Sequence, residues 1–132
     1  MKNIISYQKY YTDMCELNNI LKLNKENFDV IICLKRSGFM LGAFLSNQLT
    51  KPLFTPSEIQ SMPKDFKSAL IVDDKICTGK SINRVRKRIL KNFKNNISRV
   101  YSAVLYIEGN QKADYFIDNL GSIHHMFYEV KI

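Results

Sequence analysis

The sequence of 132 residues contains only three cysteines, three prolines and five glycines, and it has no tryptophan. The cysteines, Cys15, Cys33 and Cys77, are far apart, and no C-x-x-C pair or histidine cluster accompanies them. This spacing argues against a disulfide framework and against a zinc site. Cys33 lies within an apolar run, so we expect it to be a small buried side chain.

Long apolar stretches are also absent. The N-terminal segment is interrupted by Lys2, Gln8, Lys9 and Asp13, and no apolar run approaches the length of a transmembrane helix. We therefore expect a soluble, cytoplasmic protein with no membrane partner. Because 45% of its residues are hydrophobic and 24% are charged, we expect residues 1–132 to form one domain with its own core.

Acidic residues are few, since 12 Asp and Glu stand against 20 Lys and Arg and give a formal net charge of +8. A basic protein can bind nucleic acid or act on a polyanionic substrate, and composition does not separate the two. Many cations lie on one predicted amphipathic helix that has no acidic residue: Arg84, Arg86, Lys87, Arg88, Lys91 and Lys94. Such a face is usually solvated, but it keeps RNA binding open as an alternative.

Residues 69–81 are the most informative stretch and read ALIVDDKICTGKS. Four apolar residues predict a buried strand, and the amphipathic pattern after Ser81 predicts a helix. In a parallel α/β sheet, residues that directly follow a strand lie in the crevice where ligands bind. Thr78 to Ser81 would place backbone N–H groups, two hydroxyls and the permissive Gly79 at a helix N-terminus, which suits a phosphate.

Two carboxylates, Asp73 and Asp74, stand at the end of this predicted strand. Neighbouring strand residues point to opposite sides, so one carboxylate can reach a sugar diol or a metal shell while the other orients it. The motif therefore indicates a ligand with hydroxyls at one end and a phosphate at the other. A P-loop is excluded by spacing, because Asp74 stands where that motif needs its first glycine.

Residues 71–81 resemble the signature of the type I phosphoribosyltransferases, which bind phosphoribosyl diphosphate (PRPP). The resemblance implies that Asp73 and Asp74 hold the ribose 2′- and 3′-hydroxyls and belong to a magnesium shell indirectly, through PRPP and water. The following loop would surround the 5′-phosphate. The PRPP-binding residues expected here are Asp73, Asp74, Lys75, Ile76, Cys77, Thr78, Gly79, Lys80 and Ser81. We also expect a homodimer.

A second cationic segment follows the strand predicted over residues 28–34 and reads Lys35-Arg36-Ser37-Gly38. Two cations on a strand-to-helix loop, beside an expected phosphate loop, predict a clamp for a diphosphate. In the family, the corresponding loop binds pyrophosphate and usually reads Arg-Gly-Gly. The resemblance therefore implies that these four residues bind PRPP, with Ser37 in place of a glycine.

Residues 101–129 resemble the tail of the 6-oxopurine phosphoribosyltransferases, with Lys112-Ala113-Asp114-Tyr115 where the family has a Lys-Pro-Asp-Tyr-like run. The resemblance implies that Lys112 hydrogen-bonds a purine carbonyl and that Ile123 or His124 covers the base. Cys77 departs from the pattern, because 6-oxopurine members carry an aspartate there that handles the base proton. Adenine- and orotate-type bases therefore stay open. Lys75 is a second departure, since the family usually has an apolar residue there.

The predicted fold class is α/β, with three α/β/α layers and a mostly parallel five-stranded sheet in strand order 2-1-3-4-5. We expect helices at residues 6–23, 39–49, 82–95 and 112–120, and strands at 28–34, 51–54, 69–72, 97–107 and 126–132. The loop over residues 55–67 leaves room only for a reduced hood in place of the family's longer mobile lid.

The expected function is transfer of ribose 5-phosphate from PRPP to a nucleobase, preferably a purine, with release of pyrophosphate. The expected catalytic residues are Asp73, Asp74, Lys35 and Arg36, and magnesium would neutralise the leaving group. One alternative is a non-catalytic module that senses PRPP or a nucleotide and binds RNA through the basic helix. A second is a degenerate domain that binds nucleotides without turnover.

Overall fold

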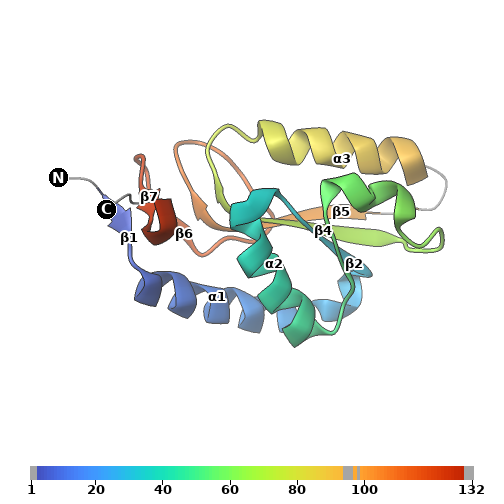
Figure 1. Ribbon diagram of the computed structural model, residues 1–132, viewed down its shortest axis with the longest axis horizontal. Helices are drawn as coiled ribbons and strands as arrows, with labels where there is room; N and C mark the ends of the chain where they lie inside the picture. Colours follow the sequence, from blue (N-terminus) through green and yellow to red (C-terminus); the bar gives the residue numbers. More distant parts are fainter. Residues whose placement is uncertain (1–2, 94–96, 98, 130–132) are drawn as a thin grey trace.

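Five parallel strands form the central sheet of the computed structural model (Figure 1). The structure describes residues 3–93, 97 and 99–129, and only the backbone of Lys35. The strand order is β3-β2-β4-β5-β6, which confirms the predicted order 2-1-3-4-5 when the five strands are counted along the chain. Their bounds are Val30–Cys33 for β2, Leu53–Phe54 for β3, Ser68–Ile76 for β4, Arg99–Ile107 for β5 and Asp118–Asn119 for β6.

Helices cover both faces of this sheet, as the three-layer prediction requires. The helices α1 (Tyr7–Lys22) and α2 (Lys35–Leu49) lie on one face, and α3 (Lys80–Phe93) lies on the other (Figure 1). The 3-10 turn η2 (Pro56–Ser61) joins α3 on its face, where Ile59 is fully buried. The segment predicted as a reduced hood is therefore short and packed against the body of the protein.

The pleat of β4 sends alternate side chains into two separate cores. Leu70 and Val72 pack with residues of α1 and α2, whereas Ile71 packs with residues of α3. Because this alternation continues to the end of the strand, Asp74 falls on the α1 side and Asp73 on the α3 side. The pleat of the strand thus places the two carboxylates on opposite faces of the sheet.

Local signals place α1 and α2 against the sheet. Ser6 caps α1, since its Oγ accepts a hydrogen bond from the Lys9 N–H at 3.1 Å. On α2, a Cβ atom at Gly42 would lie 2.7 Å from Cβ of Cys33, which is buried as expected. Glycine therefore allows α2 to approach β2 closely, and this approach fixes where the N-terminus of α2 lies.

Several predicted bounds and elements are wrong. The strand β4 continues to Ile76 rather than ending at residue 72, so Asp73 and Asp74 lie within it. The helix α2 begins at Lys35 rather than Phe39, so the expected loop over residues 35–38 is the first turn of the helix. Residues 112–120 form no helix; they run along β5, and the Tyr115 N–H donates to the Ser102 carbonyl at 3.0 Å. The fifth strand is β6 rather than residues 126–132.

The end of the chain pairs with its beginning. The strand β7 (His125–Met126) and the strand β1 (Ile4–Ile5) form a separate two-stranded parallel sheet. A 3-10 turn, η3 (Phe127–Glu129), follows β7. The rest of the strand predicted over 126–132 and the predicted end of α3 near residue 95 lie outside the described residues. Within the described ranges, no helix has both the length and the apolar character needed to cross a membrane.

Candidate functional site

The loop between β4 and α3 encloses a pocket of about 70 Å³ at the carboxyl end of the sheet. Asp73 and residues 75–82 line this pocket, which we call the loop pocket. Gly79 has φ of +78°, a left-handed conformation that glycine adopts without strain, and Thr78 Oγ1 accepts a hydrogen bond from the Lys80 N–H at 3.3 Å. The first N–H groups of a helix lack intrahelical partners and carry its positive dipole end, so the pocket suits an anion.

The acidic pair near the carboxyl end of β4, Asp73 and Asp74, is divided between two environments. Asp73 lines the loop pocket, and its Oδ1 accepts a hydrogen bond from the Asp74 N–H at 2.8 Å. Asp74 does not line this pocket: its Oδ1 accepts a hydrogen bond from the Tyr10 hydroxyl at 2.6 Å, and its Oδ2 accepts one from the Tyr128 hydroxyl. Of the two carboxylates, only Asp73 lines the loop pocket, because the pleat turns Asp74 toward α1.

The surroundings of Asp74 change its proton affinity. Burial raises the pKa of Asp74 to about 6, although the hydrogen bonds from Tyr10 and Tyr128 oppose the rise. Burial and the neighbouring Asp74 raise the pKa of both tyrosines, which stay neutral donors. The two hydrogen bonds to the Asp74 carboxylate thus link α1, β4 and η3.

A third carboxylate, Glu108, directly follows β5 and is 6% exposed. Its Oε1 accepts a hydrogen bond from the Cys77 thiol at 2.8 Å, and its Oε2 accepts one from the His124 N–H at 2.7 Å. The Lys75 ammonium lies 3.6 Å from Oε2 and donates to the His124 carbonyl at 2.7 Å. Burial alone would raise the pKa of Glu108, but these hydrogen bonds and the charge of Lys75 lower it.

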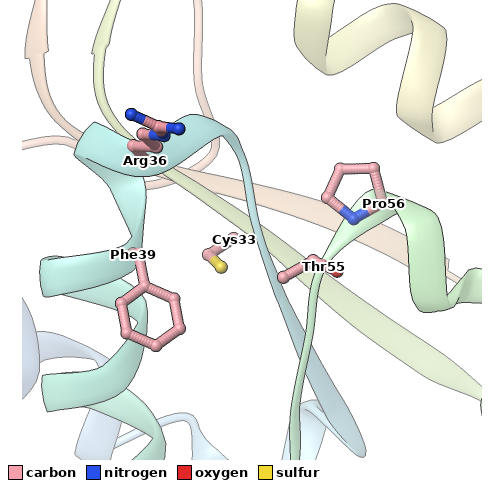
Figure 2. Close-up of a pocket in the computed structure, with 5 residues that line it drawn as sticks. All are labelled: Cys33, Arg36, Phe39, Thr55 and Pro56. Atoms are coloured by element: carbon pink, nitrogen blue, oxygen red, sulfur yellow. The ribbon is translucent and has the colours of Figure 1, made fainter.

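The first turn of α2 approaches the same edge of the sheet. A Cβ atom at Gly38 would lie 3.0 Å from Asp73 Oδ1, so only a glycine fits there without a shift. Arg36 is exposed and stands above a cavity of about 340 Å³ between α2 and η2 (Figure 2). Arg36 and Ser37 also line a hollow of about 390 Å³ beside Tyr128. The prediction for the Lys35 side chain lies outside the described residues.

No protein-family model and no curated protein matches the chain, but solved structures resemble it closely. A xanthine-guanine-hypoxanthine phosphoribosyltransferase from Helicobacter pylori has a TM-score of 0.82 at 23% identity, covering 98% of this chain and 95% of that one. A purine phosphoribosyltransferase from Pyrococcus horikoshii has a TM-score of 0.79 at 20% identity, covering 99% and 95%. The chain has the phosphoribosyltransferase fold.

A third structure of this fold is a hypothetical protein from Neisseria gonorrhoeae with bound ppGpp. Its TM-score is 0.74 at 16% identity, covering 98% of this chain and 91% of that one. The likeness to the phosphoribosyltransferases therefore extends over nearly the whole chain rather than over residues 71–81 alone. At these identities it concerns the fold, so ligands and reaction must be argued from the residues.

The phosphoribosyltransferase fold brings most of the predicted PRPP-binding residues to one edge of the sheet. Asp73 and residues 75–81 share the loop pocket, and Gly38 at the start of α2 adjoins Asp73. Of the predicted base-binding residues, His124 reaches this edge through its backbone contacts with Glu108 and Lys75. Lys112 and Ile123 are exposed, Ile123 by 72%.

Sequence reasoning missed three contributors to this edge of the fold: Glu108, Tyr10 and Tyr128. Glu108 had a usable signal, because it directly follows a buried strand, where ligand-binding residues of a parallel sheet are found. Tyr10 lies on the buried face of α1, but no local pattern links its hydroxyl to a carboxylate 64 residues away. The described residues include no group of three His, Cys, Asp or Glu that could hold a metal ion.

Proposed function

We propose that the protein transfers the ribose 5-phosphate unit of PRPP to a purine base and releases pyrophosphate. The observation that carries this proposal is the loop pocket, where a buried carboxylate, Asp73, and the N-terminus of α3 line the same small space. One end of such a site suits sugar hydroxyls and the other suits a phosphate. The preference for a purine is supported by the similarity of the fold to the purine phosphoribosyltransferases from Helicobacter pylori and Pyrococcus horikoshii.

In the proposed complex, Thr78 to Ser81 bind the 5′-phosphate through N–H groups and hydroxyls. Asp73 accepts hydrogen bonds from the ribose hydroxyls, and Asp74 orients it through its own N–H group. Arg36, together with Lys35, binds the diphosphate from the start of α2. The reaction then depends on positioning and on stabilising the charge that develops on the leaving group.

Magnesium enters this proposal as a companion of the substrate. Asp73 is the one carboxylate that lines the loop pocket, and the described residues provide no three-ligand cluster. Oxygens of PRPP and water would therefore supply most of the magnesium shell. When bound, the ion neutralises the diphosphate as it leaves.

A homodimer and a cytoplasmic location also belong to the proposal. The adjacent residues Phe39 and Met40 expose large apolar side chains on α2, 51% and 42% respectively. Exposed apolar side chains beside a functional edge are a feature of subunit contacts. This supports assembly through α2, while the location follows from the proposed substrates.

The proposed reaction is tested with PRPP, magnesium and a panel of bases, namely hypoxanthine, guanine, xanthine, adenine and orotate, by measuring pyrophosphate. We expect release with at least one purine. Asp73→Asn should lower kcat/KM for PRPP about 100-fold, because it removes a charged acceptor from the site. The matched change Asp65→Asn affects an exposed aspartate near the amino ends of the strands and should leave activity unchanged.

Two results would contradict this assignment. The first is PRPP binding without pyrophosphate release for every base in the panel. The second is full activity in Asp73→Asn, which would remove the proposed sugar-binding group from the reaction.

A second candidate is a non-catalytic module that senses PRPP or a nucleotide and binds RNA through α3. The exposed cations of α3 favour this candidate: Arg84, Lys87, Arg88 and Lys91. A further support is that the Neisseria structure of this fold holds ppGpp, a guanine nucleotide with two diphosphate groups. Binding of such ligands without release of pyrophosphate would favour this candidate over the transferase.

A further inference from the structure

A base that gains a ribosyl group on nitrogen must lose a proton. In the proposed reaction the N–C1′ bond forms, the C1′–O bond breaks with its electron pair on the diphosphate, and an N–H proton leaves the base. That proton needs an acceptor within hydrogen-bond reach. Asp73 is assigned to the sugar, and Asp74 is bound by two tyrosine hydroxyls on the α1 side of the sheet.

Glu108 is the buried carboxylate that adjoins the loop pocket from the neighbouring strand. The register of β4 and β5 pairs Ile76 with Ile107, and the Glu108 N–H donates to the Ile76 carbonyl at 3.0 Å. This pairing sets Glu108 beside Cys77, which lines the loop pocket. A carboxylate from β5 thus reaches the start of the loop that follows β4.

The donors that reach Glu108 are of two kinds. The His124 N–H and the Lys75 ammonium approach Oε2, and the two residues are also bonded to each other. Oε1 instead accepts its hydrogen bond from the thiol of Cys77, a weak donor on an exposed side chain. Rotation of the Cys77 side chain would therefore open Oε1 to a stronger donor from the crevice.

We propose that Oε1 of Glu108 takes this place in the reaction: it accepts a hydrogen bond from an N–H group of the incoming base and then receives its proton. The inference rests on the function proposed above. Lys75, Cys77 and the His124 backbone face Glu108 and keep it charged, which a proton acceptor requires. The base then lies between the loop pocket and the segment that contains His124.

The test begins with Glu108→Gln, which keeps the size of the side chain but removes its charge. We expect kcat for base transfer to fall about 100-fold, the scale of a lost general base. PRPP affinity, measured by calorimetry without a base, should stay within about twofold. The acid limb of the wild-type kcat profile, caused by protonation of Glu108, should be absent in this variant. Glu26→Gln, on an exposed turn, is the matched control.

A rescue variant separates proton transfer from a merely structural role. Cys77→Asp in the Glu108→Gln background places a carboxylate where the thiol now meets Oε1, and should restore kcat at least tenfold. Because Glu108→Gln leaves Lys75 without its buried partner, the fold of each variant is checked by circular dichroism. If Glu108→Gln does not fold, Glu108→Asp is used instead. It keeps the negative charge but shortens the side chain, which moves the carboxylate away from the base, so kcat should fall with PRPP affinity unchanged.

The outcomes distinguish the two proposals. If the wild type releases no pyrophosphate with any base, the proposed function fails, and the role of Glu108 fails with it. If the wild type is active and Glu108→Gln keeps its rate and its acid limb, the role of Glu108 alone is overturned. A folded double variant that shows no recovery also overturns it.

Discussion

The residue with the most unusual surroundings is Asp74, which is 2% exposed and bonded to two tyrosine hydroxyls. Its pKa of about 6 lies above the ordinary value of 3.8, so the folded protein binds this proton more tightly than the unfolded chain does. The resulting stabilisation is fully present below the unfolded pKa. It is lost as pH rises through 6.

Asp74→Asn should remove this pH dependence, because asparagine does not titrate. Between pH 4 and 7.5, the unfolding free energy of the wild type should fall relative to the variant by about 2 kcal/mol, from 1.36 kcal/mol per pKa unit and a window that begins just above the unfolded pKa. Urea denaturation at a series of pH values measures the difference. Parallel curves for the two proteins would show that Asp74 titrates at its ordinary pKa.

Tyr128→Phe provides the complementary measurement for the same carboxylate. It removes a hydrogen bond that holds the pKa of Asp74 down, so the loss of stability should move to higher pH. Together, Asp74→Asn and Tyr128→Phe distinguish the effect of the carboxylate on stability from the effect of the tyrosine that donates to it.

At the residue scale, the sequence predicts the features that depend only on neighbouring positions in the chain. The pleat rule anticipated that Asp73 and Asp74 point to opposite sides, and the structure shows that they do. The resemblance implied that both meet one diol, and this stays a prediction. The partners of Asp74 could not be predicted, since Tyr128 is 54 residues away and is brought near by the pairing of β7 with β1.

At the scale of elements, long periodic segments were predictable and the chain end was not. The stripe of α1 and the apolar run of β4 carry their own periodicity. Residues 112–120 show a weak helical pattern, but their N–H groups find carbonyls on the open edge of β5, as Ile117 does with Leu105. Pairing along a free strand edge therefore outweighed a marginal local propensity.

The turn that joins β4 to α3 yields a prediction at this scale. Gly79→Ala places a Cβ atom at a left-handed φ of +78° and 3.1 Å from the Gln111 side-chain oxygen. We expect stability to fall by about 1–2 kcal/mol and PRPP affinity to fall more than tenfold, because the loop must reshape. Urea denaturation and calorimetry measure the two effects.

Gly121→Ala is the matched control for Gly79→Ala. Gly121 has φ of +73° and no heavy atom within 4 Å of an added Cβ, so it shares the backbone strain but lies outside the loop pocket. It should lose similar stability and keep its PRPP affinity. Equal losses of affinity in both variants would mean that global destabilisation, rather than the loop, controls binding.

At the scale of the whole molecule, strand order was predictable because right-handed crossovers leave few arrangements of a parallel sheet. Composition alone did not predict whether the net charge of +8 serves to bind nucleic acid or a polyanionic substrate. In the structure, α3 buries Ile82, Val85, Ile89 and Phe93 and turns its cations outward. The exposed face of α3 is thus separate from the loop pocket at its N-terminus, so charge and proposed catalysis can be tested independently.

Replacing Arg84, Lys87, Arg88 and Lys91 together by Gln removes four positive charges, which leaves a formal net charge of +4. If the protein is a transferase, pyrophosphate release should be unchanged, because these side chains lie on the solvent face of α3. RNA binding by the wild type should then be weak at physiological salt and should vanish as salt rises. Fluorescence anisotropy with a labelled single-stranded RNA measures the affinity.

The control for this variant carries the same net charge on a different surface. Neutralising Lys22, Lys25, Lys51 and Arg99 also removes four charges but leaves α3 intact. Binding that depends only on net charge should weaken equally in both variants. Tight RNA binding that is lost in the α3 variant alone, with a salt slope lower by about 3 for four phosphate contacts, would instead identify α3 as a dedicated RNA surface. Together with the absence of pyrophosphate release, that result would make the sensing module the better description of the protein.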